Sequence, residues 1–372
     1  MKCLLLIYRT KGDFLIKQKR LQFLQECIKK YAIMVATYFL QCMESGDDMS
    51  ENKQSIHGDI LSMKNMLIMT GALVILLFVG MLRFGPYVFA IAAVALAASI
   101  LVEWSFAKIR KKELGTSWMV TPLIFTMMLP VTAPLWMVAV GSAFGTFFAK
   151  GLFGGHGKNI FNPAAVGIIF VTVSFIREMT QSWFNPRVAG GWFDPSKDYG
   201  IDAVSAATPL NLAEGNLMDY SLIDLLLGNM PGAIGETFRI GVIVLGIMLI
   251  LLKIIDWRIP VFYLGTVFVF NGIGHLFAAD TFIDPVRAIL LGGVMFGAFF
   301  VATEPVSAPL SFKGKVMYGI GLGVLTVLIR TFSSFNEGVV FAIVIMNAIS
   351  PLLDSQKVIE SLKTEQTEEV EA

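Results

Sequence analysis

The sequence predicts an all-α polytopic membrane protein with about ten transmembrane helices in two inverted five-helix repeats. Hydrophobic residues make up 55% of the 372 residues and charged residues only 15%, whereas soluble domains carry about 25% charged residues. From Met63 onward, apolar runs follow closely, and most have the roughly 17–25 residues that a tilted helix needs to cross a bilayer. The net charge of +1 gives no bulk field, so we expect no nucleic-acid partner.

Residues 1–62 are predicted to form a cytoplasmic N-terminal segment. Residues 1–48 are basic and mixed in polarity, without an apolar run long enough to cross a bilayer and without a signal-peptide pattern. Either translation starts at Met49, so that residues 1–48 are not translated, or they form an amphipathic segment at the membrane surface. All three cysteines lie in this segment and none forms a CxxC pair, so we expect no metal site there.

The apolar runs fall into two sets of five. The first repeat, residues 63–178, has predicted spans at 66–82, 85–107, 117–129, 133–150 and 162–178. The second repeat, residues 233–353, has predicted spans at 233–253, 258–279, 285–303, 314–331 and 336–353. The span at 117–129 is too short to cross alone and ends at Pro130, which favours a broken or re-entrant helix buried in protein.

Three pairs of sequence landmarks suggest that the two sets are copies. Residues 130–135 read PVTAPL and residues 305–310 read PVSAPL, an offset of 175. Pro86 and Pro260, and likewise Asn162 and Asn336, are related by an offset of 174. Because each copy has an odd number of spans, the copies must lie in opposite orientations, as in the inverted repeats of many transporters.

Lysine and arginine near the span ends predict the orientation. Starting inside, the loops on the cytoplasmic side hold ten of them and the opposite loops hold six. Both termini, including the acidic tail 354–372, are therefore predicted to be cytoplasmic. The polar segment 179–232 is predicted to be an extracytoplasmic loop.

This loop contains the string DAVSAATPL, which begins at Asp202 and ends at Leu210. Small residues surround Thr208, and Pro209 keeps it out of helical geometry, so a modifying enzyme could reach its hydroxyl group. By composition alone the string is an ordinary turn and a helix N-cap region in an exposed loop.

The string resembles the flavinylation motif Asp-x-x-(Ser/Thr)-(Gly/Ala)-Ala-Thr of the D subunit of Rnf complexes and the B subunit of Na⁺-translocating NADH:quinone reductase. The resemblance implies that an exported flavin transferase attaches FMN to Thr208 through a phosphoester bond. Asp202, Ser205 and Ala207 occupy the other motif positions, while Ala206 stands where glycine is common. The predicted outward placement of the loop agrees with a transferase that acts outside the cytoplasm.

A second string, GGHGKNIFNPAAVG from Gly154 to Gly167, resembles the GGxGxNxFNPA segment of the same family. The resemblance implies a noncovalent riboflavin at Asn159 and Asn162, whose amides offer the donors and acceptors that a flavin ring edge needs. The alternative is a tight loop and a helix cap, because Asn162-Pro163 is a typical helix start. No second histidine or cysteine lies near His156, so we expect a loop residue there, not a metal ligand.

A third string, VATEPVSAPLS from Val301 to Ser311, resembles the family's Ala-Thr-Asp/Glu-Pro-Val pattern. Glu304 could lie near a cation path, because carboxylates within a membrane are functional candidates. It could also be a helix-end carboxylate at the membrane interface. Further ionisable side chains near the ends of predicted spans are Glu103, Glu178, Arg239 and His275.

The resemblance covers roughly residues 60–355 and is nearest to the D subunit of Rnf complexes. It implies a membrane flavoprotein subunit of an ion-translocating electron-transport complex in the bacterial inner membrane. Electrons would pass through FMN between ferredoxin and NAD. The complex would couple this electron transfer to the movement of Na⁺ or H⁺ outward across the membrane. The sequence has neither a dinucleotide fingerprint nor iron–sulfur ligands, so partner subunits must hold those sites. Thr208 would be an anchor, and we expect no catalytic residue and no catalysis by the isolated chain.

Two alternatives come from other functional classes. An inverted five-plus-five repeat with a broken helix is also typical of a small-solute channel or transporter of the urea-transporter-like fold. A purely structural scaffold for partner subunits is compatible with the composition but explains neither motif. The string from Asp202 to Thr208 distinguishes these alternatives, because a pore has no need of it.

Overall fold

The computed structural model describes residues 62–112, 114–115, 117–180, 221–278, 281–333 and 337–354. All regular structure within these ranges is helical, which confirms the predicted all-α class. Four helices are long and apolar enough to cross a membrane: α3 (Met63–Phe84), α4 (Tyr87–Arg110), α12 (Arg258–Phe277) and α15 (Phe312–Phe332). The chain is therefore a polytopic membrane protein.

The remaining helices are shorter and fall on either side of the 179–232 segment. In the first half, residues 63–180, they are α5 (Val120–Met127), α6 (Leu135–Gly145), the π-helix η1 (Thr146–Gly151), α7 (Pro163–Ser174) and α8 (Ile176–Thr180). In the second half, residues 221–354, they are α10 (Leu222–Leu227), α11 (Arg239–Leu251), α13 (Pro285–Leu290), α14 (Val294–Phe296), the π-helix η4 (Gly297–Val301) and α16 (Val339–Leu353).

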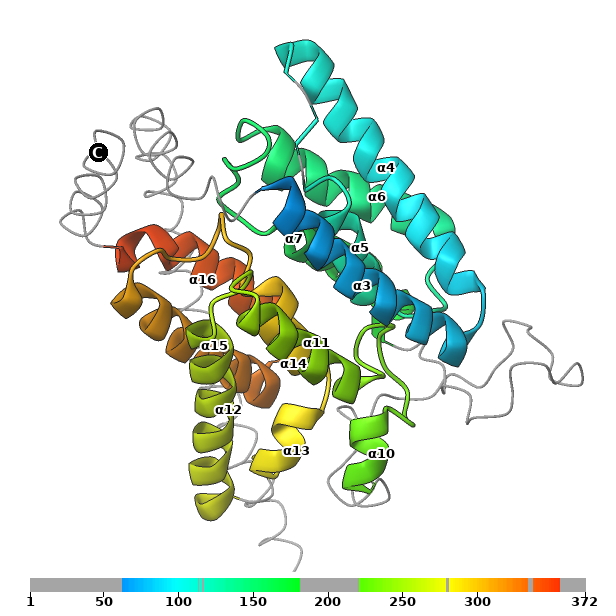
Figure 1. The fold of residues 1–372 in the computed structure, drawn as a ribbon. Coiled ribbons are helices and arrows are strands. Elements are labelled where there is room, and N and C mark those ends of the chain that lie inside the picture. The colour runs from blue at the N-terminus through cyan, green and yellow to red at the C-terminus, as the bar shows by residue number, and fades with distance from the viewer. Residues whose placement is uncertain are drawn as a thin grey trace, which may run out of the picture. The chain divides into compact units, whose positions relative to one another are not determined.

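Each half has its own helix packing, and pairs of helices from the two halves contact each other (Figure 1). In the first half α4 packs on α6, and α6 packs on α7. In the second half α12 packs on α15, and α15 packs on α16. The halves meet where α7 contacts α16 and where α3 contacts α11.

Glycine residues allow α15 to pack closely against α12. On α15, a Cβ atom at Gly319 would lie 3.1 Å from the carbonyl oxygen of Ile259, and one at Gly323 would lie 3.0 Å from that of Tyr263. Glycines four residues apart lie on one helix face and let two membrane helices approach closely. These two positions therefore fix how near α15 lies to α12.

The outer faces of the long helices expose large apolar side chains, as a lipid-facing surface does. Examples are Ile75 and Phe78 on α3, Leu101 on α4, and Val269 and Ile273 on α12, each more than half exposed. A water-soluble protein rarely exposes such a continuous apolar surface. The surface agrees with the membrane assignment.

Most predicted spans coincide with observed helices, but three differ. The span predicted at 233–253 begins as a helix only at Arg239, because residues 234–236 form a turn in which the amide of Glu236 donates to the carbonyl oxygen of Ala233. The span predicted at 162–178 is interrupted at Phe175, between α7 and α8. The span predicted at 285–303 is wrong as a continuous helix, because the chain leaves helical geometry at Leu291 and Gly292 has φ = 61°.

The short span at 117–129 is confirmed as a broken helix, since α5 has only eight residues and ends before Pro130. PVTAPL lies between α5 and α6, and PVSAPL lies between η4 and α15. Asn336 lies outside the described residues. Ten membrane crossings and the inverted repeat remain predictions, because only four described helices have the required length.

Candidate functional site

The flavin-attachment motif cannot be placed in the fold. Asp202, Ser205, Ala207 and Thr208 all lie outside the described residues. The two asparagines of the second motif, Asn159 and Asn162, are described. Both are buried, and both lie where the first half meets the second.

Beyond the motif, the C-terminal end of the 179–232 segment is tied to α3. The Nη1 atom of Arg83 donates a hydrogen bond to Oδ1 of Asn229 at 3.0 Å. Asn229 in turn donates to the carboxylate of Asp224 in α10 at 3.3 Å. Hydrogen bonds from Ser221 and Asn229 lower the pKa of Asp224, so this exposed carboxylate stays ionised.

Asn162 caps α7 and links it to the other half. Its Oδ1 accepts hydrogen bonds from the amides of Ala164 at 2.9 Å and Ala165 at 3.2 Å. Its Nδ2 donates to the carbonyl oxygen of Val301, at the end of η4, at 3.0 Å. The helix cap that we gave as the alternative is therefore present, and both the oxygen and the nitrogen of the side-chain amide make structural hydrogen bonds.

Asn159 joins the glycine-rich loop to the PVSAPL segment. Its Nδ2 donates to Oε1 of Glu304 at 3.1 Å and to the carbonyl oxygen of Phe161 at 3.3 Å. The other carboxylate oxygen of Glu304 accepts from the amide of Ser307 at 2.9 Å and from the Ser307 hydroxyl. Two motifs that are 145 residues apart thus form one site.

A buried ion pair lies on the other side of the loop. Nζ of Lys150, in η1, lies 2.5 Å from Oε1 of Glu103, in α4, and both side chains are less than a tenth exposed. Lys150 also donates to Oγ of Ser117 at 3.0 Å. Glu103 is therefore a paired carboxylate and not an isolated intramembrane acid.

His156 completes this network. Its Nδ1 lies 2.7 Å from Oγ of Ser117. Burial, together with the positive charge of Lys150, lowers the pKa of His156 from 6.5 to about 4, so the ring is neutral at pH 7. Because Lys150 donates to Ser117, the hydroxyl proton of Ser117 is available to donate to Nδ1 of the neutral ring.

The side chains of both networks surround a cavity of about 40 Å³. Its walls include Lys150, His156, Asn159, Asn162 and Glu304. A volume of this order holds about one water molecule, whereas sites for drug-sized ligands measure roughly 300–1,000 Å³. The asparagine pair, in the arrangement observed, does not enclose enough space for a flavin ring.

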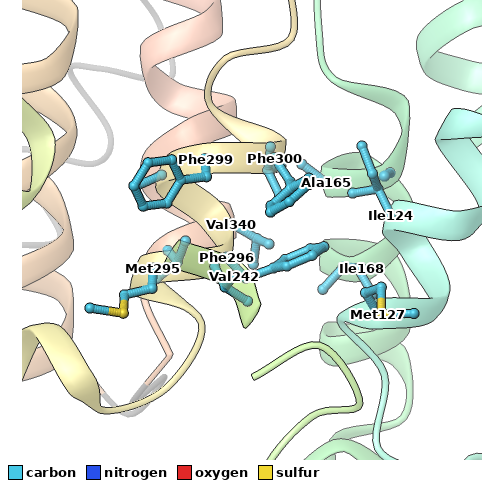
Figure 2. Close-up of a cluster of buried hydrophobic side chains, with 14 of the residues drawn as sticks. Ile124, Met127, Ala165, Ile168, Val242, Met295, Phe296, Phe299, Phe300 and Val340 are labelled. Atoms are coloured by element: carbon cyan, nitrogen blue, oxygen red, sulfur yellow. The ribbon is translucent and has the colours of Figure 1, made fainter. Parts of the chain in front are cut away.

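An apolar cluster lies next to this cavity, between the halves (Figure 2). Phe296 and Phe300 stack with their ring centroids 5.1 Å apart, and Phe300 also lines the cavity. Figure 2 shows these rings pointing toward Ile124 and Ile168 of the first half. Because all these side chains are buried and apolar, the cluster separates the polar cavity from the region beyond it.

A second charged group lies in the second half, at the break between α13 and α14. Arg330 donates to the carbonyl oxygens of Ala288 at 3.1 Å, Leu291 at 3.2 Å and Glu337 at 3.1 Å. The Glu337 carboxylate accepts from the amide of Gly293 at 3.1 Å. Glu337 is not among the residues predicted from the sequence, although the Gly292–Gly293 pair within a predicted span could have indicated the break.

Near this group, two further charged side chains are buried. Oε2 of Glu236 accepts from the amide of Ala233 at 3.3 Å. Arg239, only 1% exposed, donates through Nη1 to the carbonyl oxygen of Leu225 at 2.7 Å. Within the described part of the chain, no three or more His, Cys, Asp or Glu side chains converge as metal ligands would.

Comparison with known proteins places the chain in a family. The sequence pattern of the NQR2, RnfD, RnfE family matches residues 50–360. The D subunit of the proton-translocating ferredoxin:NAD(+) oxidoreductase complex of Clostridium ljungdahlii is 35% identical over 295 residues, 74% of this chain and 84% of that protein.

Two further relatives have different names but similar identities. The D subunit of the Na(+)-translocating ferredoxin:NAD(+) oxidoreductase complex of Acetobacterium woodii is 34% identical over 278 residues, 73% of this chain and 81% of that protein. The B subunit of the Na(+)-translocating NADH-quinone reductase of Azotobacter vinelandii is 34% identical over 281 residues, 72% of this chain and 66% of that protein. The chain therefore belongs to the NQR2, RnfD, RnfE family.

Proposed function

We propose that this chain is the membrane flavoprotein subunit of an ion-translocating electron-transport complex of the Rnf type. The family membership and the names of the relatives support a role as one subunit of an oxidoreductase complex. The observation that carries the flavin part of the proposal is the string from Asp202 to Thr208. A flavin transferase, acting outside the cytoplasm, would attach FMN to Thr208.

In this proposal FMN supplies the redox chemistry and the chain supplies its position. Thr208 anchors the cofactor, while Asp202, Ser205 and Ala207 form the motif that the transferase recognises. Partner subunits hold the sites for ferredoxin and NAD. The complex lies in the bacterial inner membrane, and both termini of this chain face the cytoplasm.

The transported cation is Na⁺ or H⁺. Relatives named for each ion have nearly the same identity to this chain, so identity does not distinguish the two ions. Glu304 lies beside the small cavity and next to the interface between the halves. Its carboxylate is the group of this chain that we propose to approach the moving cation.

Asn159 and Asn162 would hold a noncovalent riboflavin only in another arrangement of the loop, because the cavity beside them measures about 40 Å³. Riboflavin binding there requires the loop to open. Asn159 is the better residue for a test, since Asn162 also caps α7. Loss of extractable noncovalent flavin in Asn159→Ala would support the site, and unchanged flavin content would reduce the loop to a structural role.

The solute-channel alternative receives less support from the fold. A pore for a small polar solute needs polar side chains along its path. The interface between the halves is instead filled by the apolar cluster around Phe296 and Phe300.

Flavin attachment can be tested by in-gel fluorescence. The full chain is produced with an exported flavin transferase and run on a denaturing gel beside Thr208→Ala and Ser205→Ala. We expect a fluorescent band from the wild type, a dark band from Thr208→Ala, and a weaker but still fluorescent band from Ser205→Ala, because Ser205 belongs to the recognised motif but is not the anchor. A fluorescent Thr208→Ala band would move the anchor elsewhere. A dark wild-type band, with a labelled control protein in the same cells, would reject the flavoprotein assignment.

A further inference from the structure

A second, larger cavity lies at the end of α4 and is separate from the asparagine site. Its volume is about 390 Å³, within the range of small-molecule sites. One wall is the last two turns of α4, and the opposite wall is η1 and the glycine-rich loop. Figure 1 shows this end of α4 projecting beyond the neighbouring helices.

Positive charge dominates the walls of this cavity. Four cationic side chains line it: Arg110, Lys112, Lys150 and Lys158. The carboxylate of Glu103 also lines it, but that carboxylate is already paired with Lys150. Among the described residues, no ion pair involves Lys112 or Lys158. The cavity thus has an excess of cations that an anion could balance.

The loop geometry keeps Arg110 and Lys158 at the cavity. Nη2 of Arg110 donates to the carbonyl oxygen of Gly151 at 2.5 Å, and its guanidinium lies 4.9 Å from the ring centre of Phe106. Gly154 has φ = 114°, and a Cβ atom there would lie 2.8 Å from Cδ of Lys158. Glycine at position 154 therefore leaves room for the stem of Lys158.

The cavity lies at the level of a membrane interface. Trp104 is half-exposed on α4, and Nζ of Lys108 lies 5.0 Å from its ring centre. Tryptophan and lysine together at the end of a spanning helix mark the headgroup level. Ile109 is 77% exposed on α4, and Phe147 and Leu152, on and beside η1, also expose apolar surface that an acyl chain can cover.

We propose that this cavity binds the phosphate group of an anionic phospholipid. Basic pockets between membrane helices, at the level of the headgroups, suit such ligands. The phosphate would be bound by Lys112, Lys158 and Arg110, and the acyl chains would lie along the exposed apolar surface of α4 and η1. The site is independent of Thr208 and of flavin attachment.

The test compares two double variants with equal loss of charge. Lys112→Gln/Lys158→Gln removes two lysines that line the cavity, and Lys108→Gln/Lys111→Gln removes two nearby lysines that do not. Each protein is placed in nanodiscs that contain phosphatidylglycerol and phosphatidylcholine. The retained lipids are then counted by native mass spectrometry after transfer to detergent.

We expect the wild type and the Lys108/Lys111 variant to prefer phosphatidylglycerol. The Lys112/Lys158 variant should lose that preference roughly tenfold or more, because each lysine near an anionic surface contributes about 1 kcal/mol. An equal loss in both double variants would show a general charge effect and would overturn the site.

A second measurement distinguishes the source of the phosphate. The melting temperature of the detergent-solubilised chain is recorded with added phosphatidylglycerol or with inorganic phosphate alone. We expect only the lipid to raise it, and only in proteins that keep Lys112 and Lys158. An equal rise with inorganic phosphate would assign the cavity to a soluble phosphate compound and overturn the lipid assignment.

Discussion

The break after α5 and the break between α13 and α14 both interrupt helices in the buried part of the protein, yet different groups stabilise them. At the first break, the carbonyl oxygens of Met127 and Leu129 accept hydrogen bonds from the main-chain amides of Gly235 at 2.7 Å and Ile234 at 3.1 Å. At the second break, the freed groups are satisfied by the side chains of Arg330 and Glu337.

The comparison shows two ways to satisfy backbone groups where water is absent. An unpaired main-chain carbonyl or amide in an apolar layer costs several kcal/mol, so every break needs partners. At the first break the hydrogen-bond donors are main-chain amides, and they reach the carbonyl groups only if the two segments lie close together. At the second break the partners are charged side chains, which a single substitution can remove. The first break should therefore be sensitive to added volume, and the second to the loss of a side chain.

The largest effect is expected at the second break, from Arg330→Met. This change leaves three carbonyl groups without their donor and the Glu337 carboxylate without its cation. We expect a loss of about 3–5 kcal/mol in the free energy of unfolding, because three carbonyl groups each lose a hydrogen bond from a charged donor. Equilibrium unfolding of the protein in mixed detergent micelles measures this free energy for the variant and the wild type.

Lys313→Met is the matched control, because Lys313 is exposed on the same helix, α15. It should change stability little. If Arg330→Met were equally mild, the side-chain account of the second break would be wrong.

At the first break, Gly235→Ala should destabilise the protein by about 1–3 kcal/mol, as overpacking typically does. A Cβ atom at this position would lie 2.8 Å from Cβ of Met127 and 3.0 Å from its carbonyl oxygen. The segment would have to move away, which lengthens the hydrogen bond to Met127. The same unfolding assay measures the change.

Gly71→Ala serves as the control for this prediction, since a Cβ atom there meets nothing within 4 Å. It lies inside α3, where alanine is a better helix former than glycine. Gly71→Ala should be neutral or slightly stabilising. A neutral Gly235→Ala would mean that the first break does not depend on this close approach.

A smaller loss of stability is expected from substitutions of Asn162, whose side chain caps α7 and bonds to Val301 at the end of η4. Asn162→Ala removes the cap of α7 and the hydrogen bond to Val301, and should cost about 1–2 kcal/mol. Asn162→Asp keeps the capping oxygen but cannot donate to Val301. The difference between Asn162→Asp and the wild type, measured by unfolding, therefore isolates the contact between the halves, and the difference between the two variants isolates the cap. Equal stability of Asn162→Asp and the wild type would make that contact energetically unimportant.

The sequence predicts much of the helical framework, because the length and apolarity of a run indicate a spanning helix and proline indicates where a helix begins or ends. It predicts the first break from the short run before Pro130, and the α7 start from Asn162-Pro163. It does not predict the second break, because the apolar run continues through Leu291 and only the glycine pair marks the interruption.

The site is less predictable from the sequence, since it depends on contacts between distant segments. The pairing of Asn159 with Glu304 crosses 145 residues, and no local pattern encodes it. The pairing of Lys150 with Glu103 likewise joins two helices. Two motifs identified separately are thus parts of one site, and only the fold shows this.

The smallest effect is expected from pH, at a contact on the side of the first break. Ser117, which precedes α5, is held by His156, whose pKa is lowered to about 4 by burial and by Lys150. A histidine whose folded pKa lies below the unfolded value of 6.5 contributes fully above pH 6.5, and the contribution falls as the pH drops toward 4. Between pH 7 and pH 6 the loss should be under about 1 kcal/mol. His156→Gln, which does not titrate, should flatten the profile of unfolding free energy in this range. If the variant kept the wild-type slope, the titrating group would lie elsewhere, and the first break would have no pH-sensitive contact through His156.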